Sequence, residues 1–376
     1  ALAYAPADAS RTQTPGAVEQ VERVGGYPAA AFRVLLWRAL PEPVPVSHGA
    51  DLYRIDYWSR LRGEAVLLSG LFSAPRGAAP EAAVLWMHGT NVDRAQSVSA
   101  PSLAEGVALS GVFAGGGYLY LAPDLAGLGV SRRPQAYLDN AATLQATEDF
   151  LLAARAVAAD MGLAWPTDLY LAGFSQGGHA TGALARAFED QAPAGMRLRA
   201  AAAVAGAFDL ERISFPFALA GGSGAHALYL LLLAQSYAAA EGRPAMELLT
   251  ADAVAIAAEI AKGEDVEAAT SRLPADPRQI FQLAFLEAWD SGAPHWFRRA
   301  LVANSVLDYA PRVPFRVYFG DADRDVSPED SRSLAARAGA GRIEAVEFAG
   351  LDHGGSAYAA APRLRAWFDA LSGSPP

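Results

Sequence analysis

The chain has 376 residues, of which 52% are hydrophobic and 19% charged, a balance that is typical of a folded protein with a large core and excludes a disordered chain. Its formal net charge of −10 at pH 7 argues against a protein that binds nucleic acid through the phosphates. The longest apolar run, residues 227–234, is too short to cross a membrane.

Short apolar runs and helical patterns alternate along most of the chain. Residues 1–50 are expected to form an N-terminal arm with one helical pattern at 29–38. The sequence then predicts strands at 51–58, 64–73, 82–87, 118–122, 169–172, 201–205, 315–319 and 343–348, and helices at 141–161, 178–189 and 362–372. This order predicts an α/β fold: a mostly parallel sheet covered by helices on both faces, with the first two strands as an antiparallel edge.

One long interval interrupts this alternation. From residue 208 to residue 310 only helical patterns occur, notably at 225–234, 246–261 and 279–289. We therefore predict a core built from residues 51–207 and 311–376, and a helical cap at 208–310 over the carboxyl edge of the sheet.

Residues 173–177 read Gly-Phe-Ser-Gln-Gly and stand between a predicted strand and a predicted helix. A serine at such a sharp turn has a strained backbone, and only glycines two positions before and after it leave room for the turn. The turn lifts the hydroxyl of Ser175 above the sheet edge and aims the backbone N–H of Gln176 at the same space. The alternative interpretation is that Ser175 merely caps the helix.

A serine hydroxyl becomes a good nucleophile only when a base removes its proton, and imidazole titrates near neutral pH. The chain has six histidines, and only His353 lies in a loop near the C-terminus, after the predicted strand at 343–348. An acid is expected between the serine and the histidine in chain order. Asp321, Asp323 and Asp325 all follow the predicted strand at 315–319, and any of them can orient an imidazole or simply form a turn.

A reaction at Ser175 that creates an oxyanion requires two preorganised N–H donors. Gln176 supplies one of them. The second is expected from the segment Gly89-Thr90-Asn91, which follows the strand at 82–87. We favour Thr90, whose hydroxyl can add a third donor, and Asn91 is the alternative.

Together these motifs resemble the α/β-hydrolase superfamily and, within it, the secretory-lipase type of esterases and lipases. The resemblance covers about residues 50–370 and is carried by the serine turn, the helical insertion, Met87-His88-Gly89-Thr90, Ala100-Pro101-Ser102 and the segment 123–129. It favours Asp323 as the acid, with Asp321 second and Asp325 third, because Gly320-x-x-Asp323-x-x-Val326 resembles the acid loop of that family. The chain departs from these relatives in having no cysteine, so it cannot form any disulfide they contain.

The resemblance implies a carboxylic ester hydrolase that acts on a small-molecule or lipid ester through Ser175, Asp323 and His353, without a metal or cofactor. Leu230, Leu231 and Leu233 belong to a run that is hydrophobic on all sides and must be buried. By hypothesis they line an acyl pocket, and the alternative is that they fill the core of the cap.

Other functions are compatible with the same residues. A peptidase or an acyltransferase can use this set, because fold and triad do not determine the substrate, and a non-catalytic binding module is an alternative of another class. The sequence starts at Ala1 without an initiator methionine, and we expect a secreted or periplasmic protein.

Overall fold

The computed structural model describes residues 13–100, 104–263, 265–307, 309–339 and 341–373. Residues 1–12 of the predicted arm, and Pro101 and Ser102 of the Ala-Pro-Ser motif, lie outside this part. Within it, one sheet contains nine strands in the order β1-β2-β3-β5-β4-β6-β7-β8-β9. The strands are β1 (Val18–Tyr27), β2 (Ala50–Leu61), β3 (Glu64–Pro75), β4 (Ala82–Met87), β5 (Leu119–Pro123), β6 (Asp168–Phe174), β7 (Arg197–Val204), β8 (Phe315–Gly320) and β9 (Ile343–Phe348).

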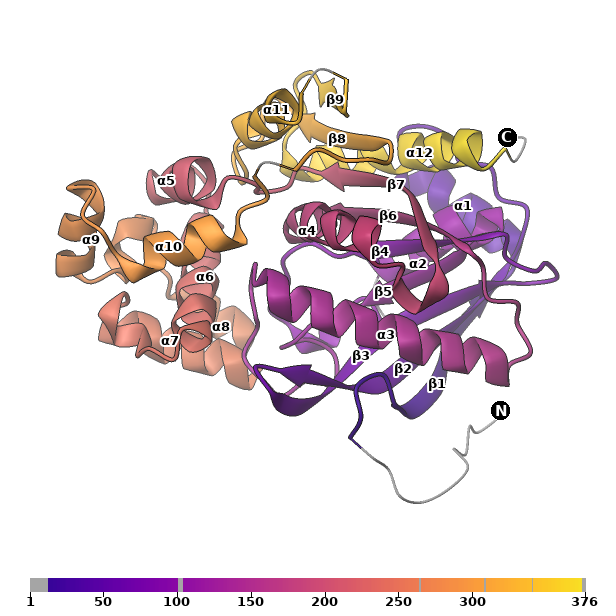
Figure 1. Cartoon of the computed structure of the whole chain (residues 1–376), viewed down its shortest axis with the longest axis horizontal. Helices are drawn as coiled ribbons and strands as arrows, with labels where there is room; N and C mark the ends of the chain where they lie inside the picture. Colours follow the sequence, from indigo (N-terminus) through magenta and orange to yellow (C-terminus); the bar gives the residue numbers. More distant parts are fainter. Residues whose placement is uncertain (1–12, 101–103, 264, 308, 340, 374–376) are drawn as a thin grey trace.

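Helices cover both faces of this sheet (Figure 1). One face carries α3 (Asn140–Asp160), α4 (Gln176–Asp190) and α11 (Pro328–Arg337), and the other carries α1 (Ala29–Ala39), α2 (Ala104–Phe113) and α12 (His353–Ser372). The central strands are apolar throughout because both of their faces are buried: in β4, Leu85 packs toward α3 and α4, while Trp86 packs toward α2. The short helical turns are η1 (Arg94–Gln96), η2 (Ala114–Gly116), η3 (Pro193–Gly195), η4 (Leu210–Ser214), η5 (Ala245–Glu247) and η6 (Pro277–Ile280).

The strand directions agree with the prediction. The pairs β1–β2, β2–β3 and β3–β5 are antiparallel, and all other neighbouring strands run parallel. The predicted α/β sheet with helices on both faces is therefore confirmed.

The N-terminal segment differs from the prediction. Instead of belonging to an arm, residues 18–27 form β1, the edge strand of the sheet, so the strand predicted at 51–58 is the second one. The side chains of β1 are only half-buried or exposed because the strand has a neighbour on one side alone. Its apolar pattern is correspondingly weak, and Gly25 and Gly26 interrupt it.

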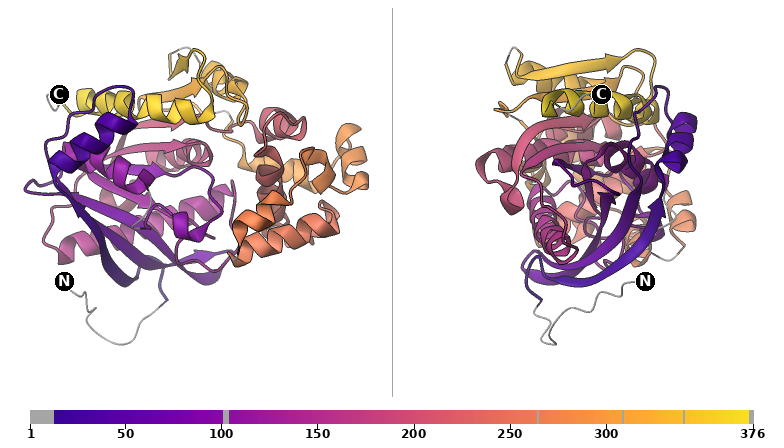
Figure 2. Two further views of the ribbon diagram at one scale, coloured as in Figure 1. Left: turned by 180° about the vertical axis from the view of Figure 1, so that it is seen from behind. Right: turned by 90° about the vertical axis from the view of Figure 1, so that its right-hand side faces the viewer.

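The chain between β7 and β8 contains helices and no strand within the described residues. These helices, here called the insertion (Leu210–Asn304), gather beside one end of the sheet in both views of the molecule (Figures 1 and 2). They have a core of their own, in which Phe215 packs against Trp289 with ring centroids 4.4 Å apart and against Phe297 at 5.3 Å. The helices are α5 (Phe215–Leu219), α6 (His226–Ala240), α7 (Ala251–Lys262), α8 (Val266–Ser271), α9 (Leu283–Asp290) and α10 (Trp296–Asn304). Among all described residues, no helix has the length and apolar character that crossing a membrane would require.

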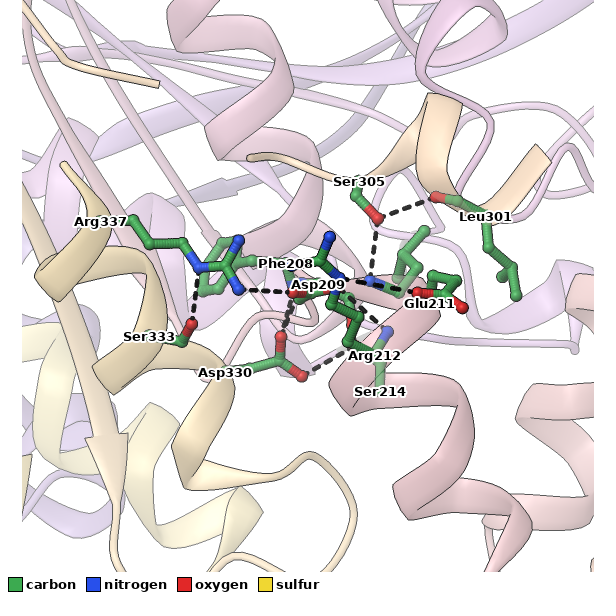
Figure 3. A network of polar contacts seen from close by, with 11 residues as sticks. Phe208, Asp209, Glu211, Arg212, Ser214, Leu301, Ser305, Asp330, Ser333 and Arg337 are labelled. Atoms are coloured by element: carbon green, nitrogen blue, oxygen red, sulfur yellow. Dashed lines mark hydrogen bonds and ion pairs between the residues drawn. The ribbon is translucent and has the colours of Figure 1, made fainter. Parts of the chain in front are cut away.

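A buried polar network fixes the start of the insertion to the sheet layer (Figure 3). The carboxylate of Asp330, on α11, accepts the backbone N–H groups of Phe208 at 3.0 Å and Asp209 at 2.7 Å, and the hydroxyl of Ser214 at 2.7 Å. Asp209 in turn pairs with Arg337 at 3.1 Å. Because unpaired polar groups are costly in the interior, this network specifies one position for the first turn of the insertion.

The end of the insertion is hydrogen-bonded to the residues at its start. The hydroxyl of Ser305 accepts the N–H of Leu210 at 3.0 Å and donates to the carbonyl of Leu301 at 2.8 Å (Figure 3). The N–H of Val306 donates to the carbonyl of Phe208 at 2.8 Å. Both connections between the insertion and the sheet layer are therefore held side by side.

Replacing Asp330 by Asn should change how stability depends on pH. Burial raises the pKa of Asp330 from its ordinary value of 3.8 to about 7. The folded protein therefore keeps a proton on this carboxyl at pH values where the unfolded chain has lost it, and the contribution of Asp330 to the free energy of unfolding should fall as pH rises from about 4 to 7. Asp330→Asn lacks this contribution, so its free energy of unfolding relative to the wild type should rise by up to about 1.4 kcal/mol per pH unit across that range, as measured by urea unfolding.

The matched control is Asp252→Asn, an exposed position on α7, which should keep the wild-type pH profile. If Asp330→Asn also keeps that profile, Asp330 does not hold its proton more tightly in the folded state.

Candidate active site

The turn between β6 and α4 places Ser175 in a strained backbone conformation, with φ of 57° and ψ of −116°. A Cβ atom on Gly173 would lie 2.3 Å from the carbonyl oxygen of Gly177, and one on Gly177 would lie 1.8 Å from that of Met87. Both contacting atoms belong to the backbone, so relieving either contact would require a shift of the main chain. The two glycines are therefore required by the close approach of α4 to β4 and β6, which is the steric reason expected from the motif.

Ser175, His353 and Asp323 form a continuous hydrogen-bonded chain. The hydroxyl of Ser175 lies 2.9 Å from Nε2 of His353, and Nδ1 of His353 lies 2.6 Å from Oδ2 of Asp323. The three residues follow the carboxyl ends of β6, β9 and β8, which meet at one edge of the sheet. They expose only 5%, 8% and 6% of their surface, respectively, so water competes little for these hydrogen bonds.

Two features hold His353 and Asp323 in position. His353 is the first residue of α12, which starts nine residues before the helix predicted at 362 and contains Pro362 in its interior. The imidazole packs against the ring of Phe174, with centroids 4.7 Å apart. The other carboxylate oxygen of Asp323 accepts the N–H groups of Asp325 at 2.8 Å and Val326 at 3.0 Å, so its orientation is fixed by the backbone.

The other two aspartates of this loop have different partners. Asp321 accepts the N–H of Gly350 at 2.6 Å. Asp325 accepts a hydrogen bond from the hydroxyl of Ser223, in the insertion. Of the three candidates, the structure brings Asp323 to the imidazole of His353.

The expected oxyanion donors both border the space around Ser175. Gln176 is the first residue of α4, and the first N–H groups of a helix have no partner within the helix. Thr90, after β4, lines a cavity together with Ser175, and so does the alternative donor Asn91. The hydroxyl of Thr90 lies 2.8 Å from that of Tyr137, which gives the proposed third donor a protein partner.

An inner cavity lies between Ser175 and the insertion. It is lined mainly by apolar side chains. The lining residues are Tyr137, Leu138, Ser175, Gln176, Ala207, Leu210, Ser214, Phe215, Phe217, Ala218, Tyr229, Leu230, Leu233, Asp325, Val326 and Ser327. Leu230 and Leu233 are thus placed where the sequence hypothesis expected them. Leu231 is not among the lining residues and is fully buried within the core of the insertion, so that part of the hypothesis is wrong. The reason is helical geometry, since successive residues point about 100° apart.

An outer cavity lies on another side of Ser175 and contains more polar groups. Its members are His88, Gly89, Thr90, Asn91, Gln96, Ser97, Val98, Glu105, Leu128, Phe174, Ser175, Tyr229 and His353. Ser175 and Tyr229 line both cavities. The sequence did not point to Tyr229, Tyr137 or Glu105, because no local pattern marks a side chain whose role depends on segments distant in the chain.

Among the remaining histidines, His179 on α4 is buried. Its Nδ1 lies 2.5 Å from the carbonyl oxygen of Ala207, and its Nε2 lies 2.8 Å from Oδ1 of Asn140. Burial lowers the pKa of His179 to about 4, so the ring is neutral at neutral pH. Its contacts make it a structural residue beside the start of the insertion. In the part of the chain that the structure describes, no cluster of three or more His, Cys, Asp or Glu side chains has the arrangement to hold a metal ion.

No protein-family model and no curated protein sequence matches this chain. Solved structures do resemble it. A Legionella pneumophila protein described as a candidate hydrolase is 20% identical, with a TM-score of 0.86 over 94% of this chain and 98% of its own. The rice cell wall degrading esterase LipA from Xanthomonas oryzae is 21% identical, with a TM-score of 0.79 over 95% and 97%. Lipase A from Candida antarctica, in its closed state, is 14% identical, with a TM-score of 0.67 over 96% and 84%. The chain has the α/β-hydrolase fold, as its motifs predicted.

Substitution of Gly177 by Ala should strongly destabilise the protein. The added methyl would collide with the backbone of Met87, and relief requires moving α4 away from β4. We expect a loss of about 3 kcal/mol in the free energy of unfolding, measured by urea denaturation.

Gly354, close to the same site, is the matched control, because a Cβ there meets no atom within 4 Å. Gly354→Ala should be nearly neutral. A Gly177→Ala protein as stable as the wild type would contradict the steric role of this glycine.

Proposed function

We propose that the protein is a serine hydrolase that cleaves carboxylic esters through an acyl-enzyme on Ser175. The observation that carries this proposal is the unbroken hydrogen-bonded chain from the strained Ser175 through His353 to Asp323. A buried helix-capping serine would need neither a strained backbone nor an imidazole that is itself oriented by a carboxylate.

The arrangement of these residues supports acyl transfer by the following steps. Nε2 of His353 accepts the proton of Ser175 as its oxygen attacks the ester carbonyl carbon. Asp323, at Nδ1, holds the imidazole in the tautomer whose Nε2 is free to accept, and it stabilises the imidazolium that forms. The negative carbonyl oxygen of the tetrahedral intermediate is stabilised by the N–H groups of Gln176 and Thr90.

Collapse of the intermediate breaks the bond to the alcohol oxygen, and His353 returns its proton to that oxygen. Water then attacks the acyl-enzyme, again giving a proton to His353, and the acid leaves as Ser175 recovers its hydrogen. Ester hydrolysis is favoured as the reaction because an apolar cavity adjoins Ser175 and because two of the similar structures are an esterase and a lipase.

Assays on p-nitrophenyl butyrate and on leucine p-nitroanilide test this proposal. The wild type should hydrolyse the ester and leave the amide almost untouched. Ser175→Ala and His353→Ala should each lower kcat for the ester by at least about 10⁴-fold, and Asp323→Asn should cost about as much because it favours the wrong tautomer.

Asp321→Asn is the matched control, since Asp321 contacts Gly350 and not the imidazole. It should retain activity within a few-fold. Preferential cleavage of the amide would indicate a peptidase, and full ester activity in Ser175→Ala would contradict the proposed nucleophile.

A further inference from the structure

The two cavities that meet at Ser175 differ greatly in size. The inner cavity offers about 50 Å³ of accessible space and the outer cavity about 340 Å³. An ester bound at Ser175 has two halves, the acyl group and the alcohol, and each half needs space beside Ser175.

The position of His353 indicates which half of the ester lies in which cavity. In the proposed reaction its imidazole must deliver a proton to the alcohol oxygen, so the alcohol lies on the side of Ser175 where His353 is accessible. His353 lines the outer cavity together with Ser175 and is not among the residues that line the inner one. The alcohol therefore belongs in the outer cavity and the acyl group in the inner cavity.

The inner cavity is the smaller of the two and therefore favours a short acyl group. Its lining is mainly apolar, which suits an acyl group rather than a polar alcohol. Its walls cannot yield easily, because Phe215, Leu230 and Leu233 are 1%, 1% and 5% exposed and form part of the core of the insertion.

An acidic residue, Glu105, is among those that line the outer cavity. Oε1 of Glu105 accepts the indole N–H of Trp86 at 3.0 Å, which fixes the side chain, and Oε2 accepts no hydrogen bond from the described residues. No Arg or Lys is among the residues described as lining this cavity. A carboxylate in such a place favours a partner that donates hydrogen bonds and repels an anion.

We propose that the substrate is an ester between a short acyl group and an alcohol that carries hydroxyl donors, and that Glu105 is the residue that selects this alcohol. The inference rests on the proposed ester hydrolysis at Ser175 and adds the chemical class of both halves of the substrate.

A series of p-nitrophenyl esters tests the acyl half, because the alcohol stays constant. The value of kcat/KM should be highest between acetate and butyrate and should fall by at least about 100-fold at palmitate. Phe217 lines the inner cavity and is only half-buried, so Phe217→Ala should extend the range toward octanoate. Leu283→Ala, at an exposed position of the insertion, should keep the wild-type series. Equal rates on butyrate and palmitate in the wild type would overturn this half of the proposal, whether or not Phe217→Ala folds.

Three butyrate esters of similar size test the alcohol half: those of glycerol, n-pentanol and glycolic acid. The wild type should prefer the glycerol ester and react most slowly with the anionic glycolate ester. Glu105→Gln keeps an oxygen for Trp86 but loses the charge, and it should lower the preference for glycerol over pentanol by about tenfold. Glu81→Gln, at an exposed position outside both cavities, should keep the wild-type preference.

The outcomes separate this inference from the proposed function. Hydrolysis of all esters without a glycerol preference, or a preference that Glu105→Gln leaves intact, would overturn the role of Glu105 while ester hydrolysis at Ser175 stands. No hydrolysis of any of these esters, p-nitrophenyl butyrate included, would contradict the proposed function itself, and the inference with it.

Discussion

The close approach of α4 to the strands β4 and β6 is the constraint on which the rest of the site depends. It is possible only because residues 173 and 177 have no side chain, and it forces Ser175 into a backbone conformation that an ordinary helix start would avoid. The same turn places the serine oxygen at the sheet edge, within hydrogen-bond distance of His353, and starts α4 at the next residue, Gln176. Strain at one residue thus positions both the serine that we propose as the nucleophile and the N–H that we propose as an oxyanion donor, and the surrounding packing stabilises it.

The insertion forms part of the surroundings of that serine. Its two connections to the sheet layer are joined through Phe208, Leu210 and Ser305, and the side chain of Asp330 accepts hydrogen bonds from the first turn. Leu210 and Ser214 belong both to this anchored turn and to the lining of the inner cavity. The buried polar network therefore fixes the position of one wall of that cavity.

Much of this arrangement could be predicted from sequence, for reasons that particular residues make clear. The strands at 82–87 and 343–348 match β4 and β9 because apolar runs bounded by loops carry strong local signals. Ser175 and His353 are indicated by the segments that follow such strands, whereas Asp323 is distinguished from Asp321 and Asp325 only by the resemblance of its loop to that of a known family; the structure brings the three together. The edge strand β1 was missed because a half-buried strand has a weak pattern. Leu231 was misplaced, and Glu105 and Tyr229 were not found, because side-chain direction and cavity membership depend on tertiary contacts that no local pattern encodes.

We propose that Ser175 is a nucleophile activated by His353. The most direct test of this role is the intact mass of the protein after exposure to a fluorophosphonate, followed by peptide mapping. We expect one phosphonyl group per chain, bonded to Ser175, and a much slower reaction in His353→Ala. A protein that gains no adduct, or gains it equally fast without the imidazole or at another residue, would show that Ser175 does not have this role.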